Sequence, residues 1–234
     1  MTYAKWDEAA IAKGLNRLNN AERVKNYIKE PLEEVMTPLL KGKELLLAES
    51  INVRMLLIFT HIDLLGYLYT GDSSPRNSSK NAVAFLRKYL GRVDKRYEKV
   101  GGLLYDALRH GLVHLATPKR IQLKDGRILN FSFGGIRQRE DYLKVTKTPE
   151  IQRTGERVEI YRLFLDLSLL YEDLLSAINS FAEDISQNQE LSDVSQKAFE
   201  ARRKPEKAKE EELLNKPYIQ DSDFAFVREQ ISRL

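Results

Sequence analysis

The sequence predicts an all-α helical bundle with a small antiparallel β insert. Three observations lead to this fold class: apolar residues recur at helical spacing along most of the chain, the spacing changes to strand-like alternation after Lys119, and it becomes helical again after Tyr161. A chain of 234 residues is long enough to bury a substantial core. The absence of cysteine excludes disulfides, thiolate metal sites and cysteine nucleophiles.

Residues 1–43 predict two amphipathic helices at the start of the chain. Apolar side chains are spaced helically between residues 3 and 28, and Glu30-Pro31 is expected to end this helix because proline disfavours helical backbone in the residue before it. A second helix is expected from Pro31 to Pro38. The first residues lack the apolar core of a secretion signal, which, with the absence of cysteine, favours a cytoplasmic protein.

Residues 44–186 are expected to form the main bundle. The stretch from Glu44 to Tyr69 is apolar nearly all round, so we expect it to be the central helix. Within it, the apolar run from Leu56 to Tyr69 is interrupted by His61 and Asp63 and is too short to span a bilayer, so no membrane partner is expected.

Two helices should follow the central helix. Ser78 or Ser79 can cap the first of them, which is expected to end at Gly91. The second should begin at Asp94 and end at Pro118.

The β insert is expected over residues 119–161. Alternating side chains flank Asp125-Gly126, a dipeptide typical of a tight hairpin turn, and the second strand runs to Phe133. Residues 157–161 predict a third strand. The helix from about Tyr161 to Ile185 has the clearest apolar periodicity in the chain.

Residues 187–234 change in composition to charged and polar side chains. The pattern predicts a charged linker and a short C-terminal helix, with a nucleic-acid-binding arm as the less favoured alternative.

The segment Arg109-His110-Gly111-Leu112-Val113-His114 carries the main functional signal. It places a permanent cation and two of the three histidines on an otherwise apolar helix, where burying unpaired polar groups would be costly. Histidine can exchange a proton near neutral pH, and arginine offers a planar set of donors that suits phosphate. Together these residues indicate chemistry on a phosphodiester.

The spacing of this segment has a geometric meaning. At about 100° per residue, His110 and His114 lie about 40° apart on one helical face. Arg109 lies about 140° from His114, so only its long side chain could bring the guanidinium near that imidazole. The site would therefore be open and shared with a neighbouring surface.

Three other interpretations stay open at this stage. An arginine followed a few residues later by a histidine can arise by chance, and Arg109 and His114 could form a structural hydrogen-bonded pair. His61 and Asp63 could join His110 and His114 in a divalent-metal site, although no carboxylate stands at a characteristic metal spacing. The glycine pairs lack the context of phosphate-binding loops, so no cofactor is expected.

The segment resembles the motif of the HEPN superfamily (higher eukaryotes and prokaryotes nucleotide-binding domain). The family motif is an arginine, usually followed by a polar residue, and then a histidine after four to six intervening positions on a core helix; here these are Arg109, His110 and His114. The resemblance implies a dimer with the motif at the subunit junction and, in many members, metal-independent RNA cleavage. Members silenced by a partner nucleotidyltransferase carry a tyrosine where this chain has Ala116, so that version is not expected.

The expected function is that of a metal-independent endoribonuclease. His114 would act as general base or acid, Arg109 would hold the phosphate oxygens, and His110 would assist. The alternative is a noncatalytic helical dimer that binds a nucleotide, RNA or a protein partner. The formal net charge of +4 mildly favours an anionic partner.

Overall fold

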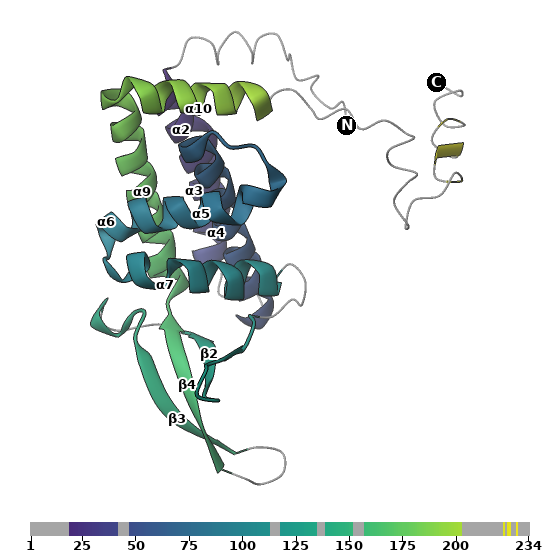
Figure 1. Cartoon of the computed structure of the whole chain (residues 1–234), viewed down its shortest axis with the longest axis vertical. Coiled ribbons are helices and arrows are strands. Elements are labelled where there is room, and N and C mark those ends of the chain that lie inside the picture. The colour runs from purple at the N-terminus through teal and green to yellow at the C-terminus, as the bar shows by residue number, and fades with distance from the viewer. Residues whose placement is uncertain are drawn as a thin grey trace. The chain divides into compact units, whose positions relative to one another are not determined.

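A computed structural model describes residues 19–41, 47–112, 118–134, 139–151 and 157–202, together with Ser222, Phe224, Ala225 and Arg228. The chain divides into two compact units, Met1–Phe199 and Glu200–Leu234. The described part of the first unit is mostly helical and carries one four-stranded sheet (Figure 1). This confirms the predicted class, a helical protein with a β insert.

The first helical segment differs from the prediction because it continues through Pro31. It consists of α2 (Asn20–Val24), the π turn η1 (Lys25–Lys29) and α3 (Glu30–Lys41). Proline lacks an N–H and crowds the preceding turn, and the wider π turn directly before it relieves that crowding. The part of the predicted first helix that precedes Asn19 lies outside the described residues. Asn19 begins α2 with a capping box that also uses Glu22.

The central helix is α4 (Leu47–Thr70), as predicted. Its stretch Ile51–Thr70 is long and apolar enough to satisfy the length and composition criteria for a membrane-spanning helix, which the core helices of soluble proteins also satisfy. Here α4 packs against α3, α5 and α9 within the bundle. Met55, Ile58 and Ile62 are fully buried on its inner face.

The next segment is longer than predicted. After η2 (Pro75–Asn77), helix α5 (Ser78–Phe85) continues through the π turn η3 (Leu86–Leu90) into α6 (Gly91–Val93). Its N-cap is Asn77 rather than a serine.

Helix α5 lies unusually close to α4. A Cβ atom added at Gly66 would come within 2.5 Å of the Ala82 backbone nitrogen, so glycine permits direct contact of the two backbones.

The motif helix begins where the sequence predicts. Asp94 accepts a hydrogen bond from the Arg96 backbone at 3.0 Å, and α7 (Arg96–Leu104) then runs into the π turn η4 (Tyr105–His110). The helix is described as far as Leu112, and its predicted end before Pro118 falls partly outside the described residues.

The sheet is mixed, which corrects the expectation of an antiparallel insert. It contains β1 (Ile121–Gln122), β2 (Ile128–Phe133), β3 (Val145–Ile151) and β4 (Arg157–Leu165) in the order β1-β2-β4-β3. The predicted hairpin is present as the antiparallel pair β1 and β2, with Gly126 at φ +84° in its turn. Strand β2 runs parallel to β4, however, and the unpredicted β3 is antiparallel to β4. A short 3-10 helix, η5 (Arg139–Asp141), precedes β3.

The helix predicted from Tyr161 is wrong at its start. Residues 161–165 complete strand β4, and α9 (Leu167–Gln187) begins only after Asp166, whose carboxylate accepts the Ser168 and Leu169 N–H groups. Tyr161, Leu163 and Leu165 are alternate residues on the face of β4 that joins the core, so strand pairing and burial override the helical spacing.

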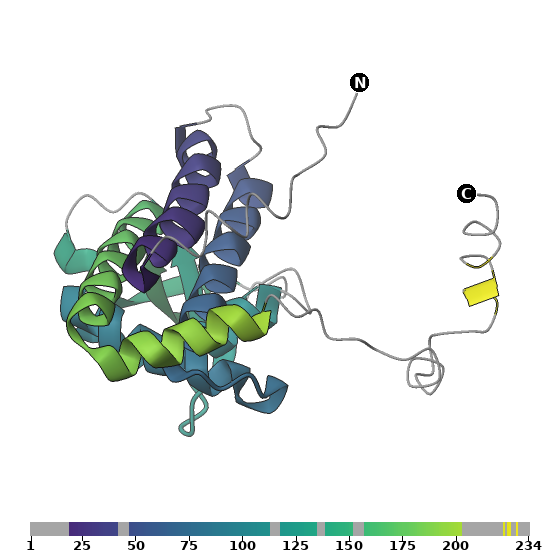
Figure 2. The same cartoon turned by 90° about the horizontal axis from the view of Figure 1, so that it is seen from above.

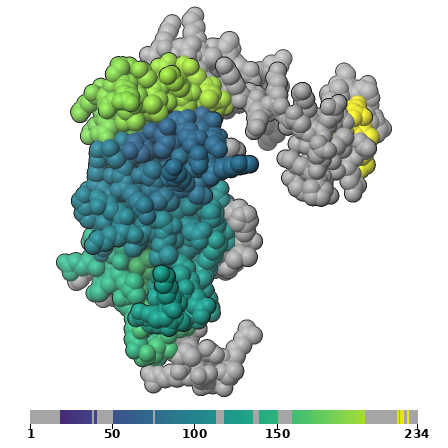
Figure 3. Space-filling model, in the orientation of Figure 1, coloured from purple at the N-terminus to yellow at the C-terminus, as the bar shows by residue number. Residues whose placement is uncertain are grey.

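Residues 189–202, where the composition predicts a linker, form helix α10 (Gln189–Arg202). Four hydrogen bonds between described residues tie it to the bundle. Ser195 Oγ donates to the Leu68 carbonyl at 3.0 Å, Tyr67 donates to the Ala198 carbonyl at 3.1 Å, and Asn20 Nδ2 donates to the Ser192 carbonyl at 3.0 Å and to Ser192 Oγ at 2.8 Å. This part of α10 crosses one end of the bundle and the sheet lies at the other end (Figures 1, 2 and 3).

Candidate active site at the motif helix

The spacing of Tyr105 and Arg109 sets the direction of both side chains. They lie four positions apart in the π turn η4, a separation that places two side chains on the same face of a helix. Both reach Asp63 on α4. The packing of η4 against α4 therefore brings the predicted arginine to a residue 46 positions earlier in the chain.

Asp63 binds one donor with each carboxylate oxygen. Tyr105 Oη donates to Oδ1 at 2.6 Å, and Arg109 Nε donates to Oδ2 at 2.8 Å. Burial, helped by the hydrogen bond to Asp63, raises the pKa of Tyr105 to about 12, so its hydroxyl stays protonated and keeps donating. The side chains of Arg109 and Asp63 are 24% and 19% exposed, so the pair lies at the edge of the core.

The outer end of Arg109 is left available. Among the described residues, Asp63 is the partner that the structure gives its guanidinium, and the bond uses Nε. Neither Nη nitrogen is bonded to a described residue, so both can donate hydrogen bonds to another group. A planar edge with two N–H donors side by side is the arrangement that binds phosphate or carboxylate oxygens.

His110 follows Arg109 but contacts a different carboxylate, that of Asp106. Its Nδ1 lies 2.9 Å from Asp106 Oδ1, and its Nε2 lies 3.4 Å from Ser79 Oγ at the start of α5. Lys119 Nζ also contacts Asp106, at 3.2 Å. Burial acts to raise the pKa of Asp106, but the hydrogen bonds from His110 and Lys119 outweigh it and lower the pKa, so this carboxylate is ionised beside the imidazole.

The structure thus places two of the three predicted site residues side by side. Arg109 and His110 share the π turn, and each is held by its own carboxylate. His114 lies outside the described residues.

The metal alternative gains no support from the described residues. His61 bonds through Nδ1 to the Leu57 carbonyl at 2.8 Å, within its own helix. No group of three or more histidine, aspartate or glutamate side chains in the described ranges is arranged to hold a metal ion.

Sequence reasoning considered Asp63 only as a possible metal ligand and assigned no role to Tyr105 or Asp106. Asp63 was a visible signal, because a carboxylate in an apolar helix needs a partner. Its partners Tyr105 and Arg109 are distant in sequence, so the pairing depends on how α4 and η4 pack. Asp106, four residues before His110, was detectable from helical spacing alone.

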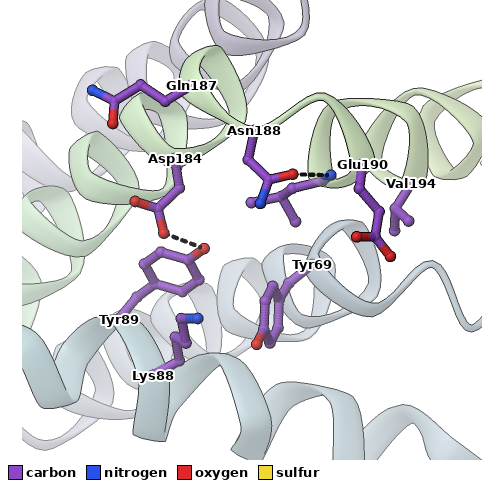
Figure 4. Close-up of a pocket in the computed structure, with 9 residues that line it drawn as sticks. Tyr69, Lys88, Tyr89, Asp184, Gln187, Asn188, Glu190 and Val194 are labelled. Atoms are coloured by element: carbon purple, nitrogen blue, oxygen red, sulfur yellow. Dashed lines mark hydrogen bonds between the residues drawn. The ribbon is translucent and has the colours of Figure 1, made fainter.

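A pocket of about 490 Å³ lies away from these residues, where η3 faces the junction of α9 and α10 (Figure 4). Its wall contains the pair Tyr89 and Asp184, joined by a hydrogen bond of 3.1 Å, and Asp184 also binds Arg92 at 2.8 Å. Tyr69 projects into the space beside Lys88 (Figure 4). None of the predicted site residues lines this pocket, and the sequence carried no signal for it.

No protein-family model matches this chain, and neither the curated proteins nor the solved structures searched include a match. The comparisons therefore neither support nor oppose the HEPN resemblance, which depends on the motif residues alone.

Proposed function

We propose that this chain is a metal-independent endoribonuclease of the HEPN type. In the reaction, the RNA 2′-oxygen bonds to the adjacent phosphorus and the bond to the 5′-oxygen of the next nucleotide breaks. His114 exchanges protons at the reacting oxygens, accepting one from the 2′-hydroxyl or donating one to the leaving 5′-oxygen, and Arg109 binds the phosphate oxygens as negative charge develops on them.

The observation that carries the proposal is the half-bound state of Arg109. Asp63, which also accepts a hydrogen bond from Tyr105, fixes the guanidinium through Nε, and neither Nη atom is bonded to a described residue, so both can bind a phosphate. Fixing a cation before the substrate arrives lowers the cost of organising it in the transition state. His110, oriented by Asp106, stands next to this position and assists in holding the substrate.

The proposal includes a two-fold homodimer that brings two copies of the motif toward a common cleft. An exposed apolar face on α4 supports it, because Val53 and Leu56 are 48% and 41% exposed and have helical spacing with Thr60. Light scattering of the intact protein should give the mass of a dimer at micromolar concentration, and Leu56→Asp should shift it toward monomer. A monomer mass for the wild type would contradict this part of the proposal.

The test of the chemistry is RNA cleavage in excess chelator. The wild type should cut RNA, leave single-stranded DNA of the same sequence intact, and release a 2′,3′-cyclic phosphate, because the 2′-hydroxyl is the nucleophile. His114→Ala should reduce the rate about 10²–10⁴-fold by removing proton transfer. Arg109→Lys should also fail largely, because an ammonium does not reproduce the planar donor edge, and His110→Ala should have the smallest effect.

Lys99→Ala is the matched control for Arg109. It removes one positive charge from the same helical segment, at an exposed side chain with no ion pair to a described residue, and should leave the rate unchanged. Cleavage that persists in both His114→Ala and Arg109→Ala would overturn the residue assignment. Cleavage abolished by chelator would favour metal-dependent chemistry instead.

A noncatalytic RNA or nucleotide binder is the second candidate. The bonding of Asp63, Tyr105 and Arg109 within one subunit favours it, because a purely structural arginine would be held in this way. RNA binding by the intact protein, measured beside cleavage, separates the two: binding without cleavage of any RNA supports the binder. A protein partner and the cytoplasmic location remain predictions of the same proposal.

A further inference from the structure

We propose that the segment 119–127, here called the basic arm, binds the phosphate backbone of single-stranded RNA and leads it to Arg109. The arm comprises Lys119, Arg120, strand β1 and the hairpin turn. This inference rests on the proposed function, since it assigns the surface that holds the substrate outside the reacting position.

Charge is the first observation. The basic arm contains four cationic side chains and one carboxylate: Lys119, Arg120, Lys124 and Arg127 against Asp125. At the other edge of the same sheet, each lysine beside or within β3 is neutralised, because Lys144 pairs with Asp141 at 3.0 Å and Lys147 pairs with Glu159 at 2.5 Å. The two edges of the sheet therefore differ in net charge, and only the arm has an excess of positive charge.

The second observation is the direction of these side chains. Exposed and half-buried positions alternate along the arm, with Ile121 packed against the core and Arg120, Gln122 and Lys124 exposed. Alternate residues of an extended chain lie about 6.5–7 Å apart on one face. Arg120 and Gln122 have this separation, which is similar to that of successive phosphates in an extended single strand. Lys124 follows in the hairpin turn, so Arg120 and Lys124 can contact phosphates that are not adjacent along the same backbone.

Arg120 and Lys124 are the cations available for binding. Neither has an ion pair or hydrogen bond with a described residue. Arg127, in contrast, pairs with Asp125 and stacks over the Tyr161 ring at 5.1 Å, which fixes the hairpin rather than leaving a free cation. Binding is therefore assigned to Arg120 and Lys124.

The third observation is that the arm is attached at the candidate active site. The Lys119 backbone N–H donates to the Ala107 carbonyl at 3.0 Å, within the π turn η4. The Lys119 side chain contacts Asp106, which in turn contacts His110 at 2.9 Å. A strand that lies along the arm thus passes directly to the turn that carries Arg109.

The binding experiment measures fluorescence anisotropy of a labelled oligouridine of about 12 nucleotides over a series of salt concentrations. In the double variant Arg120→Ala with Lys124→Ala, binding should weaken about 10-fold near 0.1 M salt, and the slope of log K against log salt should fall in magnitude by about 1.4. Single-stranded DNA should show the same losses, because the arm reads the backbone charge and not the 2′-hydroxyl.

The matched control is the double variant Lys144→Ala with Lys147→Ala. It also removes two positive charges, but from the other edge of the sheet. The salt slope should stay within error of the wild type, since Lys144 and Lys147 are already neutralised by ion pairs. Equal losses of RNA affinity in the two double variants would mean that net charge alone is responsible, and would contradict the assignment of binding to the basic arm. Absence of any RNA binding by the wild type would overturn it as well.

Cleavage assays separate this inference from the proposed function. With a dinucleotide, too short to reach the arm, the arm variant should cleave as fast as the wild type, whereas with a long RNA its KM should rise with kcat unchanged. RNA that is bound through the basic arm but never cut would disprove the ribonuclease activity and leave the proposed binding role of the arm intact. RNA of every length that is cut equally well by the arm variant would disprove that binding role and leave the ribonuclease activity intact.

Discussion

The molecule contains two clusters of tyrosine, aspartate and arginine that differ in how completely they are enclosed. In the first, Asp63 accepts hydrogen bonds from Tyr105 and Arg109. In the second, Asp173 on α9 accepts hydrogen bonds from Tyr97 at 2.8 Å and from Arg139 at 2.6 Å. Both tyrosines lie on the continuous segment of α7 and η4, eight residues apart.

The second cluster, here called the closed cluster, encloses its carboxylate, although the side chain of Arg139 is 38% exposed. The side chain of Asp173 is 5% exposed, and one nitrogen of Arg139 contacts both of its oxygens at 2.6 Å. Tyr97 makes a further hydrogen bond of 2.6 Å to Tyr142, over whose ring Arg139 lies at 5.2 Å. This cluster joins η5 and the residues leading into β3 to the helices.

The difference teaches that residue types alone do not separate a structural cluster from a functional one. Asp63 is 19% exposed and Arg109 keeps two unbound nitrogens among the described residues, whereas the Asp173 cluster lies mostly within the core. The closed cluster should matter to stability, and the open one to binding. The three experiments below test that contrast.

The largest expected effect is the loss of Asp173. Asp173→Ala should lower the free energy of unfolding by about 3 kcal/mol, because it removes the acceptor of the buried Tyr97 hydroxyl and of the half-buried Arg139 guanidinium. Urea unfolding followed by circular dichroism measures it. Asp141→Ala, at an exposed pair with Lys144, is the control and should cost less than about 0.5 kcal/mol. A cost for Asp173→Ala as small as the control would erase the distinction between the clusters.

A smaller stability effect is expected at the open cluster. Asp63→Ala should cost about 1 kcal/mol, since its partners lie close enough to the surface to bind water. It should nevertheless reduce RNA cleavage strongly, because Arg109 loses its fixed orientation. Unfolding and single-turnover cleavage of the same preparation test both statements. A large loss of stability together with unchanged cleavage would show that this cluster is structural too.

The smallest effect is a difference in pH dependence between Asp173 of the closed cluster and the neighbouring Asp94, whose Oδ2 lies 3.7 Å from Arg139 Nε. Burial raises the pKa of Asp173 above 3.8 despite its bonds to Arg139 and Tyr97, whereas the hydrogen bond from Arg96 is the largest cause that lowers the pKa of Asp94 below 3.8. The folded state therefore binds the Asp173 proton more tightly than the unfolded chain does, and the Asp94 proton less tightly.

The two aspartates should consequently show opposite trends. The stability advantage of wild type over Asp173→Asn should grow as the pH falls from about 7 toward 3.8, because the Asp173 contribution is lost as pH rises through its raised pKa. The advantage over Asp94→Asn should be full above 3.8 and shrink as the pH falls through the lowered pKa. Unfolding titrations over this range measure both, and parallel trends would contradict the assignment.

The sequence predicts those parts of the fold that local chemistry determines. The Asp125-Gly126 turn, the start of the motif helix at Asp94 and the central helix are found where expected. Parallel pairing of β2 with β4 could not be predicted, because it depends on contacts between distant segments. Strand β3 was missed because Pro149 interrupts a weak alternating pattern, and in the structure it is stabilised by pairing with β4.

The candidate site divides in the same way. Arg109 and His110 were identifiable because polar side chains on an apolar helix require an explanation. The hydrogen bond from Arg109 to Asp63 was not predictable, because the two residues lie 46 positions apart on different helices and meet only through the packing of η4 against α4. Nothing in the local sequence around either residue specifies that packing.

The absence of a side chain at Gly66, where α4 and α5 cross closely, determines how near α5 lies to the candidate site. Ser79, near the start of α5, reaches His110 Nε2 across 3.4 Å, a separation with almost no tolerance for lengthening. Even a single methyl group at position 66 would push the Ala82 backbone outward. The contact between Ser79 and the His110 imidazole therefore depends on how closely the backbones of α4 and α5 approach each other, whereas Asp106 holds the other ring nitrogen from within the same helix.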